Sequence, residues 1–236
     1  NFLDNYHNEK LIIHCPELFE RDHILDLVSD CIDHRKLSHE NLEKTITHTL
    51  EIQKHFPQTK NPLLIVNVGG YSENGFKSEN WKEEKYGILG EVLNQYVDCG
   101  VELLPQTMPP FPWHFGGQRF HNLLVDVNEI VEFCRQNNNR ICLDISHTML
   151  ACNLLKLSLD SSLHELQKYT AHLHIADAKG AAEEGLQIGS GDIPFTSIWP
   201  LIEANFQSAS FVPEVWQGHK NKGEGFWRAF DALKQL

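Results

Sequence analysis

Six short apolar runs, most of them followed by a stretch with helical character, constrain the fold of this chain more than any other feature. The runs occupy 11–17, 62–70, 100–106, 140–146, 171–177 and 210–216. Each is rich in Ile, Leu or Val, as strands of a parallel sheet are when both faces are buried. Helical patterns follow at 83–100, 127–139, 154–169, 195–206 and 225–236. Pro200 lies inside the fourth of these and is expected to break or kink it.

This alternation predicts an α/β fold built from parallel βα units. A (β/α)₈ TIM barrel has eight strands and about 250 residues. Here six units are readable in 236 residues, and the first run begins at Leu11. No linker or low-complexity segment divides the chain. We therefore predict a single TIM barrel-like domain over 1–236 that is either truncated, part of a longer chain, or closed at its open edge in another way.

The composition of the chain limits the classes of partner that it is expected to bind. A net charge of −12 argues against nucleic acid, because phosphate backbones are bound by basic surfaces. A phosphorylated small molecule needs only a local cationic pocket and stays possible. The six cysteines show no paired spacing, and the sequence contains no secretory signal and no apolar run near 18 residues. These features predict a cytoplasmic protein without a membrane partner.

Acidic and histidine side chains interrupt four of the apolar runs. They are Glu102, Asp144, His174 and Glu214, spaced by roughly one βα unit each. A buried carboxylate costs free energy unless a partner compensates its charge. In a βα barrel, active sites form where strands end at the carboxyl edge. We expect these four side chains to converge there around one divalent ion, with Mn²⁺, Mg²⁺ or Co²⁺ favoured and Zn²⁺ possible.

The same segments resemble the xylose isomerase-like superfamily of sugar isomerases and epimerases, whose barrel endonuclease IV shares. The matching segments are IIHCPE, IVNVGGY, VELLPQ, CLDISH, HLHIADAKG…IGSGDIPF and PEVWQGH. The resemblance implies that the missing units are the first two of the barrel. It also implies that Glu102, Asp144, His174 and Glu214 hold the metal, and that His147 contacts substrate oxygens or a metal.

The activity that the resemblance implies is proton transfer at a carbon next to a carbonyl of a sugar or sugar phosphate. The metal would polarise the substrate oxygens. Glu102 and Glu214, on opposite sides of the substrate, would remove and return the proton through an enediolate. A hydride shift between adjacent carbons is the other route in this superfamily, and both stay open.

Five further residues are predicted to line a substrate pocket: His14, Asn67, Trp113, Lys179 and Trp216. His14 matches a pocket position of the family. The loop 108–120, which contains Trp113, is rich in proline and aromatic residues and resembles a rigid cover. Each residue also has a plain reading, as a core histidine, a packed loop or an exposed lysine.

Gly189 and Gly191 lie in a turn that matches the family pattern. Free backbone N–H groups there could hold a phosphate, or the turn could simply lead into the next helix.

Two alternatives to an isomerase stay open. One is a non-catalytic sugar-binding module of a larger protein, which the apparent absence of two units favours. The other is a metal-dependent phosphodiesterase related to AP endonucleases. That class uses extra histidines for a three-zinc cluster, and this chain has Asn67 and Leu186 at those places, with Glu184 in place of an aspartate. A second copy of the chain could fill the missing edge, so a homo-oligomer is also possible.

Overall fold

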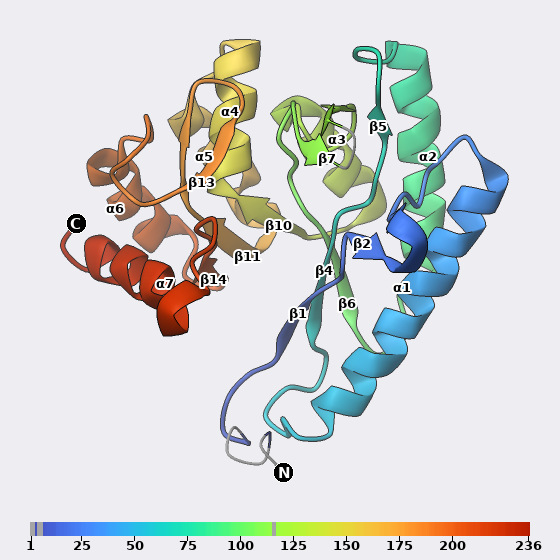
Figure 1. Cartoon of the computed structure of the whole chain (residues 1–236), viewed down its shortest axis with the longest axis horizontal. Helices are drawn as coiled ribbons and strands as arrows, with labels where there is room; N and C mark the ends of the chain where they lie inside the picture. Colours follow the sequence, from blue (N-terminus) through green and yellow to red (C-terminus); the bar gives the residue numbers. More distant parts are fainter. Residues whose placement is uncertain (1–2, 4–6, 115–116) are drawn as a thin grey trace. The chain divides into compact units, whose positions relative to one another are not determined.

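The structure is a computed structural model that describes residues 3, 7–114 and 117–236. It divides into two compact units, which are taken in turn (Figure 1). The first unit comprises Asn1–Tyr71 and Lys77–Gln106. The second unit comprises Ser72–Phe76 and Thr107–Leu236.

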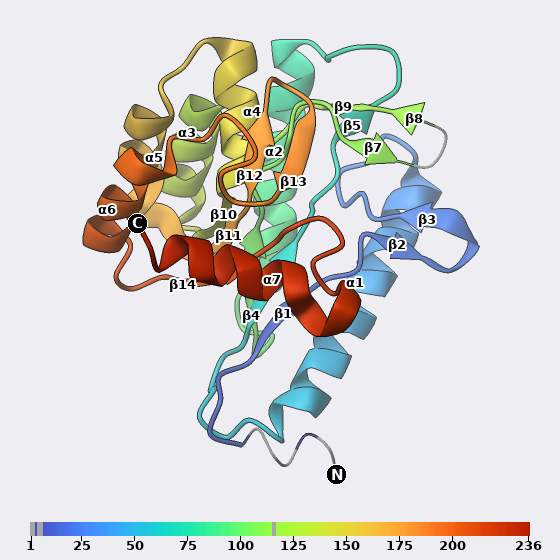
Figure 2. The ribbon, with the colours of Figure 1, turned by 60° about the vertical axis from the view of Figure 1, so that its left-hand side comes forward.

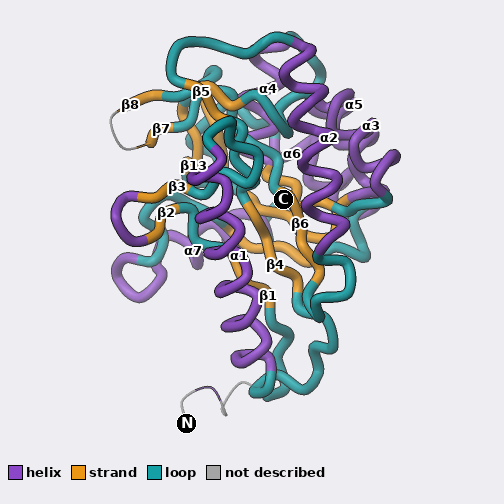
Figure 3. Tube along the Cα trace, turned by 90° about the vertical axis from the view of Figure 1, so that its right-hand side faces the viewer, coloured by secondary structure: helices purple, strands orange, loops and turns teal. Residues whose placement is uncertain are grey.

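The first unit is built on a three-stranded parallel sheet in the order β1-β4-β6. Its strands are β1 (Ile12–His14), β4 (Leu63–Val66) and β6 (Glu102–Pro105). Helix α1 (Ile32–Gln53) connects β1 to β4, and α2 (Glu79–Gln95) connects β4 to β6 (Figure 3). A small hairpin of β2 (Leu18–Phe19) and β3 (His23–Ile24), joined by η2 (Glu20–Asp22), follows β1.

The second unit contains another three-stranded parallel sheet, in the order β10-β11-β14. Its strands are β10 (Ile141–Asp144), β11 (Thr170–Ile175) and β14 (Ser210–Pro213). All residues of β10 and β11 are buried, as expected of strands covered on both faces.

Helices and short hairpins complete the second unit. The helices are α3 (Val127–Asn137), α4 (Ile145–Leu155), α5 (Leu159–Leu166) with η3 (Gln167–Tyr169), α6 (Phe195–Asn205) and α7 (Lys220–Leu233). The hairpins are β7 (Trp113–His114) with β8 (Gly117–Gln118), and β12 (Asp177–Lys179) with β13 (Glu183–Leu186). Short strands β5 (Tyr71–Ser72) and β9 (Phe120–His121) form a further two-stranded sheet. Figure 2 shows the β12–β13 hairpin alongside α4, with which it packs.

The six predicted strands are confirmed, because each apolar run contains one strand of the two parallel sheets. The predicted helix over 154–169 is wrong. Helix α4 begins directly after β10, and Lys156 ends it in a left-handed conformation with φ 59°. Ser158 then caps α5 by accepting a hydrogen bond from Ser161 N. Two helices therefore stand where one was expected.

The predicted break at Pro200 is also absent, since α6 runs from Phe195 to Asn205 through this proline. A proline at this position removes the hydrogen bond to the carbonyl of Thr196. Thr196 is exposed, so water can bind that carbonyl instead.

Within the part of the chain that the structure describes, no helix has the length and apolar character needed to cross a membrane.

Candidate functional site

Asp144 ends β10 and caps the N-terminus of α4 in the second unit. Its side chain accepts a hydrogen bond from His147 N at 2.8 Å, and its own N–H donates to Thr107 Oγ1 at 2.9 Å. Asp144 is only 3% exposed. The partial positive charge of a helix N-terminus stabilises a carboxylate placed there. The capping bond therefore both explains the sharp strand-to-helix turn and compensates part of the buried charge.

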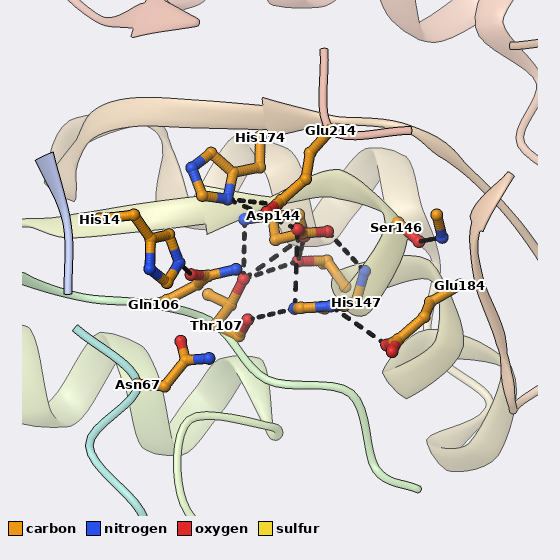
Figure 4. Close-up of polar contacts among 12 residues, drawn as sticks. His14, Asn67, Gln106, Thr107, Asp144, Ser146, His147, His174, Glu184 and Glu214 are labelled. Atoms are coloured by element: carbon orange, nitrogen blue, oxygen red, sulfur yellow. Dashed lines mark hydrogen bonds and ion pairs between the residues drawn. The ribbon is translucent and has the colours of Figure 1, made fainter. Parts of the chain in front are cut away.

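His147 is held by acceptors at both ring nitrogens (Figure 4). Nδ1 donates to the Thr107 carbonyl at 2.8 Å, and Nε2 lies 3.1 Å from Oε2 of Glu184. Burial lowers the pKa of His147, but the charges of Asp144 and Glu184 outweigh this effect and raise it to about 10. Because both ring nitrogens face acceptors, the surroundings favour the protonated imidazole.

His174 brings the ends of β11 and β14 together with Asp144. His174 is paired with Asp144 in the register of β10 and β11. Its Nδ1 lies 2.6 Å from Oε2 of Glu214 and 3.8 Å from Oδ2 of Asp144. Glu214 directly follows β14 and donates its N–H to the carbonyl of Ile175 at 3.0 Å. Asp144, His174 and Glu214 thus form one cluster at the carboxyl edge of this sheet, which we call the acidic cluster.

Burial and the repulsion between two carboxylates both raise the pKa of Asp144 in the acidic cluster. Burial raises the pKa of Asp144 to about 6; the charge of His147 opposes this rise and that of Glu214 adds to it. The Glu214 side chain is 46% exposed, whereas that of His174 is 3% exposed. Asp144 and His174 are therefore the buried part of the cluster, and the Glu214 carboxylate faces solvent.

The glycine turn that follows β13 is tied to Asp177. This fully buried carboxylate accepts from the backbone N–H groups of Gly189 and Gly191, both at 2.9 Å, and from Ile193 N at 3.1 Å. The N–H groups that a phosphate would need are therefore already used. The phosphate-binding reading of this turn is wrong, and the turn is a structural connection to α6.

Three other predicted pocket residues belong to the second unit and are exposed. Trp113 lies in the β7–β8 hairpin and is 70% exposed. Lys179 ends β12 at the tip of the β12–β13 hairpin. Trp216 is 77% exposed, and its N–H donates to the Gly185 carbonyl at 2.7 Å. That they line a pocket stays a prediction.

The carboxyl edge of the first sheet carries His14, Asn67 and Gln106. A hydrogen bond of 2.9 Å joins His14 Nε2 to Gln106 Oε1, and another of 2.7 Å joins His14 Nδ1 to the Cys15 carbonyl. Asn67 is buried, and its Nδ2 donates to Oε1 of Glu17. This edge is therefore made mainly of amide and imidazole groups.

The predicted placement of Glu102 at the carboxyl edge is wrong. Glu102 is the first residue of β6 and is in register with Leu63, which pairs with Ile12, so it lies at the amino edge of the first sheet. The run 100–106 has a polar residue near each end, and hydrophobicity alone does not show at which residue the strand begins. The polar residue at the carboxyl end is Gln106.

Sequence reasoning also missed the roles of Thr107 and Glu184. Thr107 bonds Asp144 and His147 through its hydroxyl and its carbonyl, respectively. Glu184 comes from a hairpin that was not predicted, since its residues show no apolar alternation. Both residues lie close to the segments that match the family, and this proximity is the only sequence signal that points to them.

Comparison with known proteins places this architecture in a family. The family model described as xylose isomerase-like TIM barrel matches residues 1–236. A search of curated proteins gives no match.

Solved structures share the fold at low sequence identity. A D-tagatose 3-epimerase-like protein is 20% identical with a TM-score of 0.65, over 99% of this chain and 82% of that one. The 3-keto-D-glucoside 4-epimerase from E. coli is 14% identical with a TM-score of 0.63, over 100% and 86% of the two chains. The probable 3-DHS dehydratase AsbF from Bacillus anthracis is 12% identical with a TM-score of 0.60, over 97% and 77%. With its two parallel βα sheets and a family match over its whole length, this chain belongs to the xylose isomerase-like TIM barrel family.

Proposed function

We propose that this chain is a divalent metal-dependent isomerase or epimerase of a sugar or sugar phosphate. The observation that carries the proposal is the acidic cluster, in which His174 Nδ1 faces Oε2 of Glu214 and Oδ2 of Asp144. Family membership and the sugar epimerases among the similar folds support the substrate class.

The donor set of the acidic cluster fits a divalent cation. Two carboxylates and one imidazole suit Mn²⁺, Mg²⁺ or Co²⁺, and Zn²⁺ also accepts these ligands. The repulsion between Asp144 and Glu214, which contributes to the raised pKa of Asp144, is the kind that a bound cation relieves. Asp144, His174 and Glu214 would hold the ion. When bound, it would polarise the carbonyl and hydroxyl oxygens of the sugar.

Glu214 is the proposed general base. Its half-exposed carboxylate can receive the proton from the carbon next to the substrate carbonyl at Oε2, leaving an enediolate. An aldose–ketose isomerisation can return that proton from the same group. An epimerisation needs a second group on the opposite face. Because Glu102 lies at the amino edge of its sheet, we assign that second role to Glu184.

His147 is proposed to position these groups and not to bind the metal, because Thr107 and Glu184 engage both of its nitrogens. A phosphodiesterase with a three-zinc cluster uses further histidines, and this chain has Asn67 and Leu186 at their places. That alternative is therefore not favoured.

Solvent-deuterium exchange tests the proposal. The protein is incubated with Mn²⁺ or Co²⁺ in D₂O with a panel of keto-sugars and their phosphates. One of them should gain deuterium next to its carbonyl, and Glu214→Gln should lower this rate by about 10²–10⁴-fold. Glu203→Gln, at an exposed position of α6, is the matched control.

Two other outcomes are informative. Product without deuterium indicates a hydride shift. Neither product nor exchange with any sugar refutes the proposal and leaves the non-catalytic sugar-binding module.

A further inference from the structure

We infer that Asn67 recognises a ligand hydroxyl in the first unit, and that Glu17 sets the orientation of its amide. The inference rests on the proposed function only for the class of ligand, a polyhydroxy compound. It adds which chemical group of that ligand the carboxyl edge of the first sheet accepts.

The starting observation is a buried acceptor without a partner. Asn67 follows β4 and is 6% exposed. Among the described residues, its Oδ1 is one of the few buried side-chain atoms that make no hydrogen bond. Buried amide oxygens are nearly always paired, because an unpaired one loses its hydration without compensation. A donor supplied by a ligand would remove this cost.

Glu17 determines whether the oxygen or the nitrogen of the Asn67 amide stays without a protein partner. Asn67 Nδ2 donates to Oε1 of Glu17 (the two residues lie after β4 and β1, respectively). If the amide turned by 180°, its oxygen would face the oxygen of Glu17, and an ionised carboxylate has no hydrogen to donate. The Glu17 carboxylate therefore holds Oδ1 as the half of the amide that has no partner within the protein.

Because Asn67 Oδ1 is a hydrogen-bond acceptor, a ligand that binds it must supply a donor. A hydroxyl can donate to Asn67 Oδ1, whereas a keto oxygen or a phosphate oxygen cannot. The negative charge of Glu17 beside it also disfavours a phosphate.

The side chains next to Asn67 at the carboxyl edge of the first sheet are also polar. Gln106 donates its N–H to the Val66 carbonyl at 3.1 Å, next to Asn67, and is bonded to His14 (Figure 4). These groups suit the hydroxyl-bearing part of a polyol.

The test measures discrimination between a polyol and its deoxy analogues. The full-length, EDTA-treated chain is titrated by calorimetry with D-fructose, D-tagatose, D-sorbitol and xylitol, with single-deoxy analogues of each, and with D-fructose 6-phosphate. The variants are Asn67→Leu, which keeps the side-chain size, and Glu17→Gln, which lets the amide turn. Glu20→Gln, an exposed acid close to Glu17 in sequence, is the control.

Asn67→Leu should weaken the best polyol by about 10- to 100-fold and should leave one deoxy analogue unaffected. Glu17→Gln should weaken the same polyol less and bind the same deoxy analogue as the wild type does. Because Glu17 is exposed, this variant keeps the test valid if Asn67→Leu does not fold. An equal loss for every analogue, no loss at all, or no binding of any polyol to the wild type overturns the inference.

The two proposals fail separately. Discrimination that depends on Asn67, without any deuterium exchange, refutes only the proposed reaction. Exchange with unchanged discrimination in Asn67→Leu refutes only the role of Asn67.

Discussion

Nε2 of His147 lies 3.1 Å from Oε2 of Glu184, so the β12–β13 hairpin is bonded to the first turn of α4. A second bond, from Gly185 N to Ser146 Oγ at 3.1 Å, joins the same two segments. Because Asp144 both ends β10 and caps α4, the hairpin holds Glu184 at a fixed place relative to the end of β10. A carboxylate from a surface hairpin thereby becomes part of the surroundings of the acidic cluster.

Replacing Glu184 by Gln should lower the rate of epimerisation with deuterium exchange by about 10²–10⁴-fold, because it removes the proposed second proton-transfer group. The metal content should stay at the wild-type value, because Glu184 is not a proposed ligand. Exchange assays and elemental analysis on the same preparation check both statements. Glu183→Gln, on the adjacent exposed residue of β13, is the control. Loss of metal in Glu184→Gln would show that the ligand set is assigned incorrectly.

Replacing Asp177 by Ala should destabilise the protein by about 3–5 kcal/mol, because it leaves several buried N–H groups without an acceptor. Those groups belong to Ala178, Gly189, Gly191 and Ile193. Urea unfolding measures the change. Asp192→Ala removes one exposed acceptor, for Gly180 N, and should cost less than about 1 kcal/mol. Equal losses in the two variants would contradict the assignment of the turn to Asp177.

Asp26 gives the first unit a pH-dependent stability. Burial raises the pKa of Asp26 from 3.8 to about 6, against the opposing hydrogen bonds from Gly70 N and Val28 N. The folded state therefore holds this proton more tightly than the unfolded state. Its contribution is greatest below pH 3.8, falls as the pH rises to about 6, and is constant above that.

In Asp26→Asn this contribution should disappear, since an amide keeps the acceptor but does not ionise. The difference in unfolding free energy between variant and wild type should shift in favour of the variant by about 2 kcal/mol between pH 4 and pH 6. Urea unfolding at several pH values measures it, with Asp98→Asn at an exposed position as the control. A difference that is independent of pH would show that Asp26 ionises normally in the folded protein.

Strands β10 and β11 were predictable because their burial on both faces leaves a signal in every residue. The run around Ile141 and Leu143 is an example, and its Asp144 stood out because charge is costly there. Helix α1 was harder to find. Most of its residues are polar, and only a thin stripe that includes Leu42 and Ile46 is buried.

The composition of the acidic cluster followed from family order and strand ends, but its surroundings did not. Thr107 acts through a backbone carbonyl, which has no sequence signature. Glu184 depends on a hairpin whose two strands pair locally, outside the apolar pattern. Glu102 failed for a simpler reason: the run 100–106 has a polar residue near each end, and the strand begins at Glu102, which places it at the amino edge.

The contrast between Glu102 and Glu214 gives the decisive measurement on the metal. Glu214 follows the carboxyl end of its strand and touches His174, whereas Glu102 begins its strand. After soaking in Mn²⁺ and desalting, the wild type and Glu102→Gln should each retain about one ion per chain, because a site of this donor set binds one cation. Glu214→Gln should retain much less, since it loses a charged ligand. Elemental analysis of the three proteins reads this out directly. If Glu102→Gln loses the ion and Glu214→Gln keeps it, the metal is held at the opposite edge of the strands, and the acidic cluster must be compensated by His147 and the N-terminus of α4 alone.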